Sequence, residues 1–372
     1  MLIYIGGFAL STVLLIISTK KENITKYSLA ALALIVPCLI AGLRDVSVGT
    51  DVQVYLRPMY EAAMKAANYR EYLTSSWYHI WLDLYVKDYE IGFRALVYLV
   101  SKIGRNLATV QFAIQAFTIV PVYLAARRNS ESLVWISMLV YYLMFYNTSL
   151  NLMRQCIAMA FVLLAVQYLS EEHYLKFFAC VMIGFLFHNT ALIGFAIGII
   201  YILVTRPMQN IGWKIDSRNI FTAVILVIGV LLLVKTDIFV YLLEIAGLEK
   251  YIIYIDGSTG LMPKQLLTRL PVFLLLLIHW KSSIEKERNY RFYLVMMCLD
   301  MIFSQFTSVN AYGGRIALFF SMFHIISLAY VYSKEEYKKV VRPSLSLYLL
   351  CYWLFFFVIK AKDSTIPYLF AL

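Results

Sequence analysis

Residues 132–169 read "SLVWISMLVYYLMFYNTSLNLMRQCIAMAFVLLAVQYL" and carry a single charge, that of Arg154. Two apolar runs, 132–146 and 151–169, make up this stretch, and a short polar break separates them. A helix that crosses the hydrocarbon core of a bilayer needs about 20 mainly apolar residues, and each run approaches that length when its ends are extended. The stretch therefore predicts two consecutive membrane-spanning helices, with Arg154 at the start of the second.

The rest of the chain follows the same pattern. Of its 372 residues, 62% are hydrophobic and 15% are charged, which is too apolar a composition for a water-soluble domain. We therefore predict an all-α integral membrane protein with about 12 transmembrane helices. The other predicted spans lie near residues 1–18, 28–43, 107–126, 174–187, 190–204, 220–234, 265–280, 292–306, 316–333 and 344–360.

The run 91–103, "IGFRALVYLVSKI", contains Arg94 and Lys102. Its length of about 13 residues suits a re-entrant or interfacial helix rather than a span. If this run does not cross, the short loops rich in lysine and arginine all fall on one side, which the positive-inside rule makes cytoplasmic. Both termini are then outside. The basic groups in these loops are Lys20/Lys21/Lys26, Arg127/Arg128, Lys176, Arg206/Lys214/Arg218, Lys281/Lys286/Arg288/Arg291 and Lys334/Lys338/Lys339/Arg342.

The chain is predicted to form one membrane domain over residues 1–372, with long outer segments at 44–106 and 235–264 that cover a site at the outer interface. The second segment has the apolar spacing of an amphipathic helix on the membrane surface. The net charge of +11 reflects the basic inner loops and attraction to anionic membrane lipid rather than binding of nucleic acid. The sequence has no P-loop, GxSxG or HExxH motif and no metal-ligand spacing, so it predicts neither a cofactor nor a metal.

Arginines recur at the outer ends of the predicted spans. A guanidinium in hydrocarbon costs roughly 2.5–3.5 kcal/mol unless it is paired or reaches water. Its planar fork can donate two hydrogen bonds to one phosphate, so several arginines on one face predict a shared anionic ligand such as a pyrophosphate. The alternative is that each arginine reaches individually to a lipid headgroup. The arginines in question are Arg44, Arg154, Arg269 and Arg315.

Two carboxylates follow Arg44 in the stretch "GLRDVSVGTDVQVYL", residues 42–56. Asp45 and Asp51 are candidates for acid–base catalysis at the outer interface. Two structural alternatives stay open, because Asp51 can cap a helix that begins near Val52 and Asp45 can pair with Arg44.

His188 and Glu90 are the other candidates for proton transfer. His188 interrupts the apolar stretch "FLFHNTALI", where it can instead end one short helix and begin the next. Glu90 stands four residues before Arg94, so an ion pair within one helix is the alternative for this carboxylate.

Aromatic side chains are concentrated in the first outer segment, around "WYHIWLDLY". Amphipathic rings favour the headgroup region of a membrane, so anchoring at the interface is the simplest interpretation. Stacking on a sugar is the alternative, and it makes Tyr55, Trp77 and Trp81 candidate substrate contacts.

Several short motifs occur in order between residues 42 and 320. They are "GLRDVSVGTD", "YEIGF", "NLMRQCIAMAFVLLAVQYL", "FLFHNTALI" and "GGRIALFF". Together they resemble the EpsG-like family of Wzy-type bacterial exopolysaccharide polymerases. The resemblance implies a membrane glycosyltransferase of GT-C-like polymerase or ligase architecture. It would join polyprenyl-diphosphate-linked oligosaccharide repeat units on the outer face of the cytoplasmic membrane, with a flippase and a chain-length regulator as partners.

The resemblance also assigns motif positions to individual residues. One departure concerns "YEIGF", where the family often has proline before the glycine; Ile91 stands there, which leaves the role of Glu90 open. The positions that match are Arg44, Gly49, Thr50 and Asp51 for "GLR...GTD", Arg154 and Gln155 for "RQ", and His188 for the histidine after a span.

A polymerase of this kind must hold a diphosphate leaving group and remove a proton from an acceptor hydroxyl. Arg44 is then expected to bind phosphate, and Asp51 or Asp45 to orient or deprotonate the acceptor, with His188 as the competing base. Arginine can replace a metal here because the donor is already activated. Two other functions are compatible with the sequence: a lipid-linked oligosaccharide flippase, whose charges should line a central cavity, and an O-antigen-ligase-like glycosyltransferase with a different acceptor.

Overall fold

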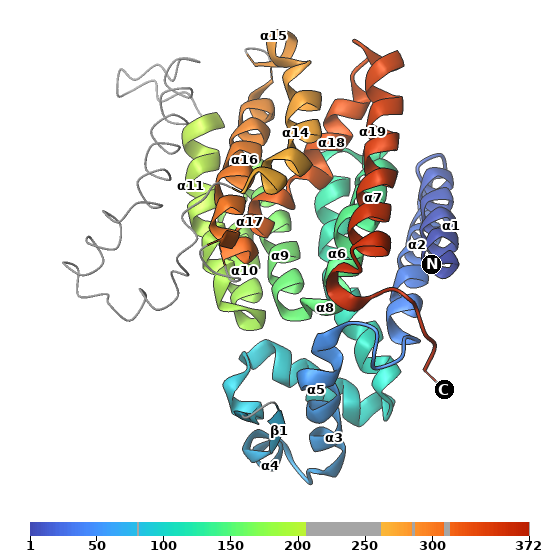
Figure 1. Cartoon of the computed structure of the whole chain (residues 1–372), viewed down its shortest axis with the longest axis vertical. Coiled ribbons are helices and arrows are strands. Elements are labelled where there is room, and N and C mark those ends of the chain that lie inside the picture. Colours follow the sequence, from blue (N-terminus) through green and yellow to red (C-terminus); the bar gives the residue numbers. More distant parts are fainter. Residues whose placement is uncertain (80–81, 206–261, 285–286, 309–312, 372) are drawn as a thin grey trace, which may run out of the picture. The chain divides into compact units, whose positions relative to one another are not determined.

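A computed structural model describes residues 1–79, 82–205, 262–284, 287–308 and 313–371 (Figure 1). Residue contacts divide the chain into two compact units, which we describe separately. Unit 1 comprises Met1–Phe195 and Arg342–Leu372, and unit 2 comprises Ala196–Val341. The prediction of a single domain over residues 1–372 remains a prediction, and most of the second outer segment, 235–261, lies outside the described residues.

Long apolar helices form the body of unit 1. Asn106 begins one of them, since its side-chain oxygen accepts a hydrogen bond from the backbone N–H of Thr109 at 2.7 Å. The helices are α1 (Leu2–Ser18), α2 (Asn23–Gly42), α6 (Leu107–Asn129), α7 (Val134–Tyr141), α8 (Asn147–Asn151), α9 (Met153–Ser170), α10 (Tyr174–Phe187), α11 (Ile193–Thr205), which continues into unit 2, and α19 (Lys338–Trp353), which begins there. Short helical turns extend this set at η3 (Glu131–Leu133), η4 (Tyr142–Tyr146), η5 (Asn189–Leu192), η8 (Leu354–Ile359) and η9 (Lys362–Ser364).

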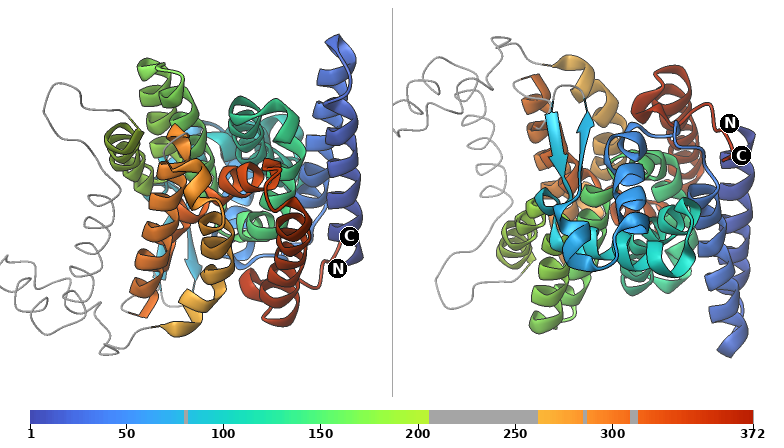
Figure 2. Two further views of the ribbon diagram at one scale, coloured as in Figure 1. Left: turned by 90° about the horizontal axis from the view of Figure 1, so that it is seen from above. Right: turned by 90° about the horizontal axis from the view of Figure 1, so that it is seen from below.

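The outer segment 44–106 folds into short elements that lie across one end of unit 1 (Figures 1 and 2). They share a buried apolar cluster that contains Tyr72 and Phe93 together with the α9 residues Met153 and Ile157. The elements are η1 (Val52–Leu56), α3 (Arg57–Lys65), α4 (Tyr69–Thr74), β1 (Ser76–His79), β2 (Leu82–Tyr85), η2 (Val86–Asp88) and α5 (Ile91–Gly104).

Two features of this segment bear on the predictions from sequence. Strands β1 and β2 pair antiparallel, with Trp77 opposite Leu84, and form a small two-stranded sheet in the described chain; the predicted all-α class is confirmed. Helix α5 corresponds to the run 91–103. With 14 residues it is too short to span a bilayer, and it packs on α3, α6 and α10.

Six of the described helical stretches are long and apolar enough to cross a membrane, which supports the membrane-protein class. About 12 transmembrane helices and a GT-C-like architecture remain predictions, and the predicted span 220–234 lies outside the described residues. Three shorter apolar helices are Leu2–Ser18, Tyr174–Phe187 and Asn189–Thr205. The six long stretches are Asn23–Gly42, Leu107–Asn129, Glu131–Asn151, Met153–Ser170, Gly314–Ser333 and Lys338–Ile359.

Unit 2 is also helical in its described part. Aromatic contacts hold it together, such as the edge-on packing of Phe292 on Phe323 with ring centroids 5.2 Å apart. Its elements are α14 (Pro263–Leu277), α15 (Trp280–Ser283), α16 (Arg288–Ser304), η7 (Gln305–Ser308), α17 (Gly313–Ser321) and α18 (His324–Ser333).

The end of unit 1 opposite the outer segment carries short basic connections. Glu131 pairs with Lys26 at 2.7 Å and with Arg127 at 3.2 Å, and Arg128 pairs with Glu171 at 2.6 Å. These ion pairs bring together three of the loops to which the charge bias assigns the cytoplasmic side. At the other end, Tyr4 donates to the backbone oxygen of Thr365, so the start and the end of the chain lie together.

Cysteine labelling can test which end faces outward. In a background without the five native cysteines, Asn129→Cys at the basic end is expected to resist an impermeant thiol reagent added outside cells, whereas Arg70→Cys in α4 is expected to react. The reason is that lysine and arginine in short loops favour the cytoplasm. Strong outside labelling at position 129 would contradict the topology.

Candidate active site

Arg154 lies in the first turn of α9, at the end of unit 1 that carries the outer segment. Its Nη1 donates to Glu90 Oε2 at 2.5 Å, and the guanidinium carbon lies 5.0 Å from the ring centroid of Tyr55 and 4.8 Å from that of Tyr89. The Arg154 side chain is 24% exposed, and its Nε has no hydrogen-bond partner among the described residues. The alternative pairing of Glu90 with Arg94 is wrong, because Arg94 instead donates to the backbone oxygen of Lys87.

The Gly-Thr-Asp turn packs directly against the start of α9. Gly49 has φ +88°, and a Cβ there would lie 2.8 Å from the backbone oxygen of Leu150, so glycine is needed for both reasons. Asn151 Oδ1 accepts hydrogen bonds from Thr50 Oγ1 at 2.9 Å and from the Asp51 N–H at 3.1 Å. The turn is thus fixed to the residues that precede Arg154.

The carboxylate of Asp51 accepts a hydrogen bond from the hydroxyl of Tyr55 at 2.8 Å. Asp51 precedes η1, but its side chain makes no capping hydrogen bond there, which contradicts the capping alternative. Burial, together with the charge of Asp51, raises the pKa of Tyr55, so the hydroxyl stays protonated and serves as a donor. Tyr55 therefore links Asp51 to the Arg154 guanidinium above its ring.

Arg44 is almost completely buried, with 2% of its surface exposed. Its Nη2 donates only to the sulfur of Met153 at 3.5 Å, its Nε has no partner, and no ion pair of Arg44 occurs among the described residues. The tyrosines Tyr4, Tyr55 and Tyr146 are among the groups that surround it. Burial lowers the pKa of Arg44 because the charged form loses its hydration. An arginine buried without a carboxylate is costly, and an anionic ligand would remove that cost.

Asp45 belongs to a local turn instead of an ion pair with Arg44. Its Oδ1 accepts from the hydroxyl of Ser47 at 2.7 Å and from the Ser47 N–H at 2.9 Å. These hydrogen bonds lower the pKa of the Asp45 carboxyl, which makes it a weak base at neutral pH. The pairing alternative for Asp45 is therefore wrong, and a catalytic role for Asp45 remains a prediction.

His188 ends α10 on the same side of unit 1. Its Nδ1 lies 2.7 Å from Thr190 Oγ1 and accepts from the Thr190 N–H at 3.3 Å, so it caps η5 as the structural alternative proposed. The backbone oxygen of Leu186, two residues before His188, would lie only 2.8 Å from a Cβ added to Gly92. The end of α10 therefore packs closely against the start of α5. Gln155, the second residue of the "RQ" motif, is buried on α9.

Trp77 is held inside the outer segment. Its indole N–H donates to the backbone oxygen of Val54 at 2.8 Å, and its ring stacks on Tyr89 at 5.8 Å and 21°. The ring of Tyr89 also contacts Tyr55 and the Arg154 guanidinium, so the tryptophan supports the arginine through this ring. Trp81 lies outside the described residues.

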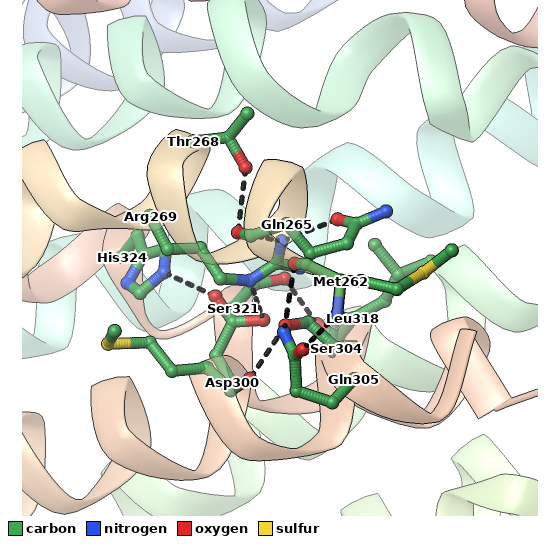
Figure 3. A network of polar contacts seen from close by, with 11 residues as sticks. Met262, Gln265, Thr268, Arg269, Asp300, Ser304, Gln305, Leu318, Ser321 and His324 are labelled. Atoms are coloured by element: carbon green, nitrogen blue, oxygen red, sulfur yellow. Dashed lines mark hydrogen bonds and ion pairs between the residues drawn. The ribbon is translucent and has the colours of Figure 1, made fainter. Parts of the chain in front are cut away.

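Arg269 and Arg315 belong to unit 2. Arg269 Nε lies 2.9 Å from Asp300 Oδ1, and Asp300 Oδ2 lies 3.1 Å from His324 Nε2 (Figure 3). Asp300 is only 1% exposed, so this pair neutralises the charge of Arg269 inside the unit. Arg315 is half-buried on α17. Substrate binding by either arginine remains a prediction.

Four polar residues that contact each other or a predicted site residue were not predicted from sequence: Thr148, Asn151, Asp300 and Asp363. In unit 1, Asn151 and Thr148 both contact Asp363 in the C-terminal tail. In unit 2, Asp300 contacts Arg269. Only Asp300 could have been found from sequence. It is a carboxylate inside a predicted span, and an unpaired charge in a span has a high free-energy cost, so a partner is expected. The described residues contain no group of three His, Cys, Asp or Glu side chains that could hold a metal ion.

These features define a helical membrane protein with a polar, arginine-containing site at one end of unit 1. The sequence matches the model of the EpsG family over residues 27–370, nearly the whole chain. The chain belongs to the EpsG family, which confirms the resemblance found in the sequence. EpsG-like proteins are Wzy-type polymerases, so membership suggests an exopolysaccharide polymerase of the glycosyltransferase type. No curated protein and no solved structure matches the chain.

The buried ion pair in unit 2 leads to a prediction about stability. Asp300→Asn should lower the free energy of unfolding by about 3–5 kcal/mol, because it leaves the charge of Arg269 buried without its counter-charge. Unfolding in detergent measures the change. Glu61→Gln is the control, since it breaks only the exposed pair with Arg57 and should cost about 0–1 kcal/mol. Equal stability of the two variants would contradict the role of the pair.

Proposed function

We propose that this protein joins polyprenyl-diphosphate-linked oligosaccharide repeat units on the outer face of the cytoplasmic membrane. One observation carries the proposal: Arg154 and Arg44 flank Met153 at the start of α9, and Arg44 is buried without a carboxylate partner. Such an arrangement favours a ligand with more than one negative charge. A diphosphate meets this need, and family membership supports it as the leaving group.

The N-terminal end of α9 adds to the attraction for an anion. The dipole of an α-helix places about half a positive charge at its N-terminus, where the first backbone N–H groups have no acceptor within the helix. Arg154 is partly exposed and would contact the diphosphate directly. Arg44 is covered, so it would act through its electric field, which weakens little in a medium of low dielectric constant.

In the proposed reaction, the acceptor hydroxyl oxygen attacks the anomeric carbon of the donor sugar. The bond from that carbon to the diphosphate oxygen breaks, and the diphosphate leaves with the electron pair. Asp51 takes the proton of the acceptor hydroxyl, and Tyr55 orients the carboxylate. Glu90 holds Arg154 in place through their ion pair, and His188 is the competing base.

The cellular setting follows from the same chemistry. The donor is a membrane lipid, so the reaction takes place at the bilayer surface, and the basic loops at the opposite end of unit 1 would face the cytoplasm. A flippase must deliver such a donor to the outer face, and a chain-length regulator is the other expected partner. No nucleic acid, cofactor or metal enters the proposed reaction.

Release of the leaving group tests this function. Purified protein in lipid vesicles, given a synthetic lipid-linked repeat unit, is expected to release one polyprenyl diphosphate for each linkage formed. The assay separates the two alternatives, because a flippase would move the donor without releasing diphosphate. An O-antigen-ligase-like enzyme would release it only when its own acceptor is present. Absence of release in the presence of donor alone would contradict the proposal.

A further inference from the structure

The C-terminal tail, residues 361–371, returns to the end of unit 1 that carries the Gly-Thr-Asp turn (Figure 1). The backbone oxygen of Leu369 accepts from the Asp45 N–H at 2.8 Å, and that of Ser364 accepts from the Gly49 N–H at 2.9 Å. The tail is therefore hydrogen-bonded to the first residue of this turn and to the segment before it, and it is part of the same site.

The backbone of the tail adopts a costly conformation where it passes α8. Ala361, Asp363 and Ser364 have φ values of 48°, 66° and 50°, in the left-handed region that residues other than glycine seldom occupy. Strained residues of this kind persist only where the surroundings hold them, and they cluster at functional sites. Here the strain directs the Asp363 carboxylate at α8, where Oδ2 accepts from Thr148 Oγ1 at 2.7 Å.

Asn151 connects this carboxylate to the turn. Its side-chain oxygen is occupied by the donors of Thr50 and Asp51, so its NH₂ group must point the other way and needs an acceptor. Asp363 Oδ1 lies 3.4 Å from that nitrogen. A polar path of contacts thus runs from Thr148 through Asp363 and Asn151 to the backbone N–H of Asp51.

We propose that Asp363 is a positioning residue for glycosyl transfer. By fixing the amide of Asn151, it holds the turn at residues 49–51 and so directs the Asp51 carboxylate at the acceptor hydroxyl. This inference rests on the proposed function of the site. It adds the C-terminal tail, which no sequence motif marked, to the parts that the reaction needs.

A reciprocal exchange of the two side chains tests the proposal. Asp363→Ala removes the acceptor for Asn151, so the turn should loosen and kcat should fall by up to about a hundredfold while KM for the donor stays nearly unchanged. The exchange starts from Asn151→Asp, which places two carboxylates together and should also lower kcat. Adding Asp363→Asn to this variant restores a donor facing an acceptor with the same total charge as in the unaltered protein, and we expect the double variant to recover at least roughly tenfold of the loss in Asn151→Asp.

Hydrogen–deuterium exchange of the backbone amides of residues 49–51 gives a measurement that does not depend on activity. Exchange should rise in Asp363→Ala and in Asn151→Asp, and it should return toward the normal rate in the double variant. Asp83→Ala, which removes an exposed carboxylate from strand β2, is the control and should change neither exchange nor kcat. Unchanged exchange in Asp363→Ala would overturn the proposal, as would normal kcat despite increased exchange. If exchange responds as expected but the unaltered protein forms no linkage, the contact path stands and the polymerase function fails.

Discussion

Asp51→Asn is expected to reduce turnover of a lipid-linked donor by roughly a hundredfold to ten-thousandfold, which is the range for removal of a positioned base. The amide keeps the size of the side chain and can still accept the hydrogen bond from Tyr55. It cannot take a proton from the acceptor hydroxyl. Donor binding should stay nearly intact, because the proposed contact of the diphosphate is Arg154 rather than Asp51. Steady-state kinetics together with direct binding of the donor measures both quantities.

His188→Gln is the matched comparison for this prediction. In the structure His188 accepts a hydrogen bond from the Thr190 N–H, so its loss should affect the corner between α10 and η5 more than the chemical step. If Asp51→Asn binds and polymerises normally while His188→Gln binds the donor but is inactive, the base is His188.

Arg154→Ala should lower the rate by about a hundredfold, equivalent to about 3 kcal/mol of transition-state stabilisation. The variant loses a partly exposed guanidinium at the start of α9, where the proposed leaving group would gather charge. Arg154→Lys should recover only part of the activity, because the ammonium retains the charge but loses the planar fork. Rates of diphosphate release measure the series.

Arg57→Ala provides the control for the arginine series. Arg57 lies in the same outer segment and pairs with Glu61 on an exposed surface, so its loss removes one positive charge without touching the site. We expect normal activity. Full activity of Arg154→Ala at normal protein levels would refute the role of Arg154 in holding diphosphate.

Much of this site could be predicted from sequence because its signals are local. The length of the apolar run predicts α9 and puts Arg154 near its start. The run 91–103 forms the short helix α5, and its re-entrant or interfacial placement remains a prediction. The glycine of "GTD" marks a turn that only glycine can make, and Gly49 indeed has positive φ.

The rest of the site depends on contacts between residues far apart in the chain. Spacing within a helix favours Glu90 with Arg94, yet the carboxylate pairs with Arg154, sixty-four positions away. Asp363 reaches α8 only because the tail folds back over the end of unit 1, and no motif marks it. The β1–β2 hairpin is similarly formed by a short aromatic stretch in which strand alternation is weak.

The most direct test of the central claim is the size distribution of the product. Purified protein in vesicles should convert a lipid-linked repeat unit into a ladder of chains whose masses differ by one repeat unit, and Asp51→Asn should give no ladder. A single added unit, or donor that only changes membrane leaflet, would contradict the assignment of this chain as a polymerase.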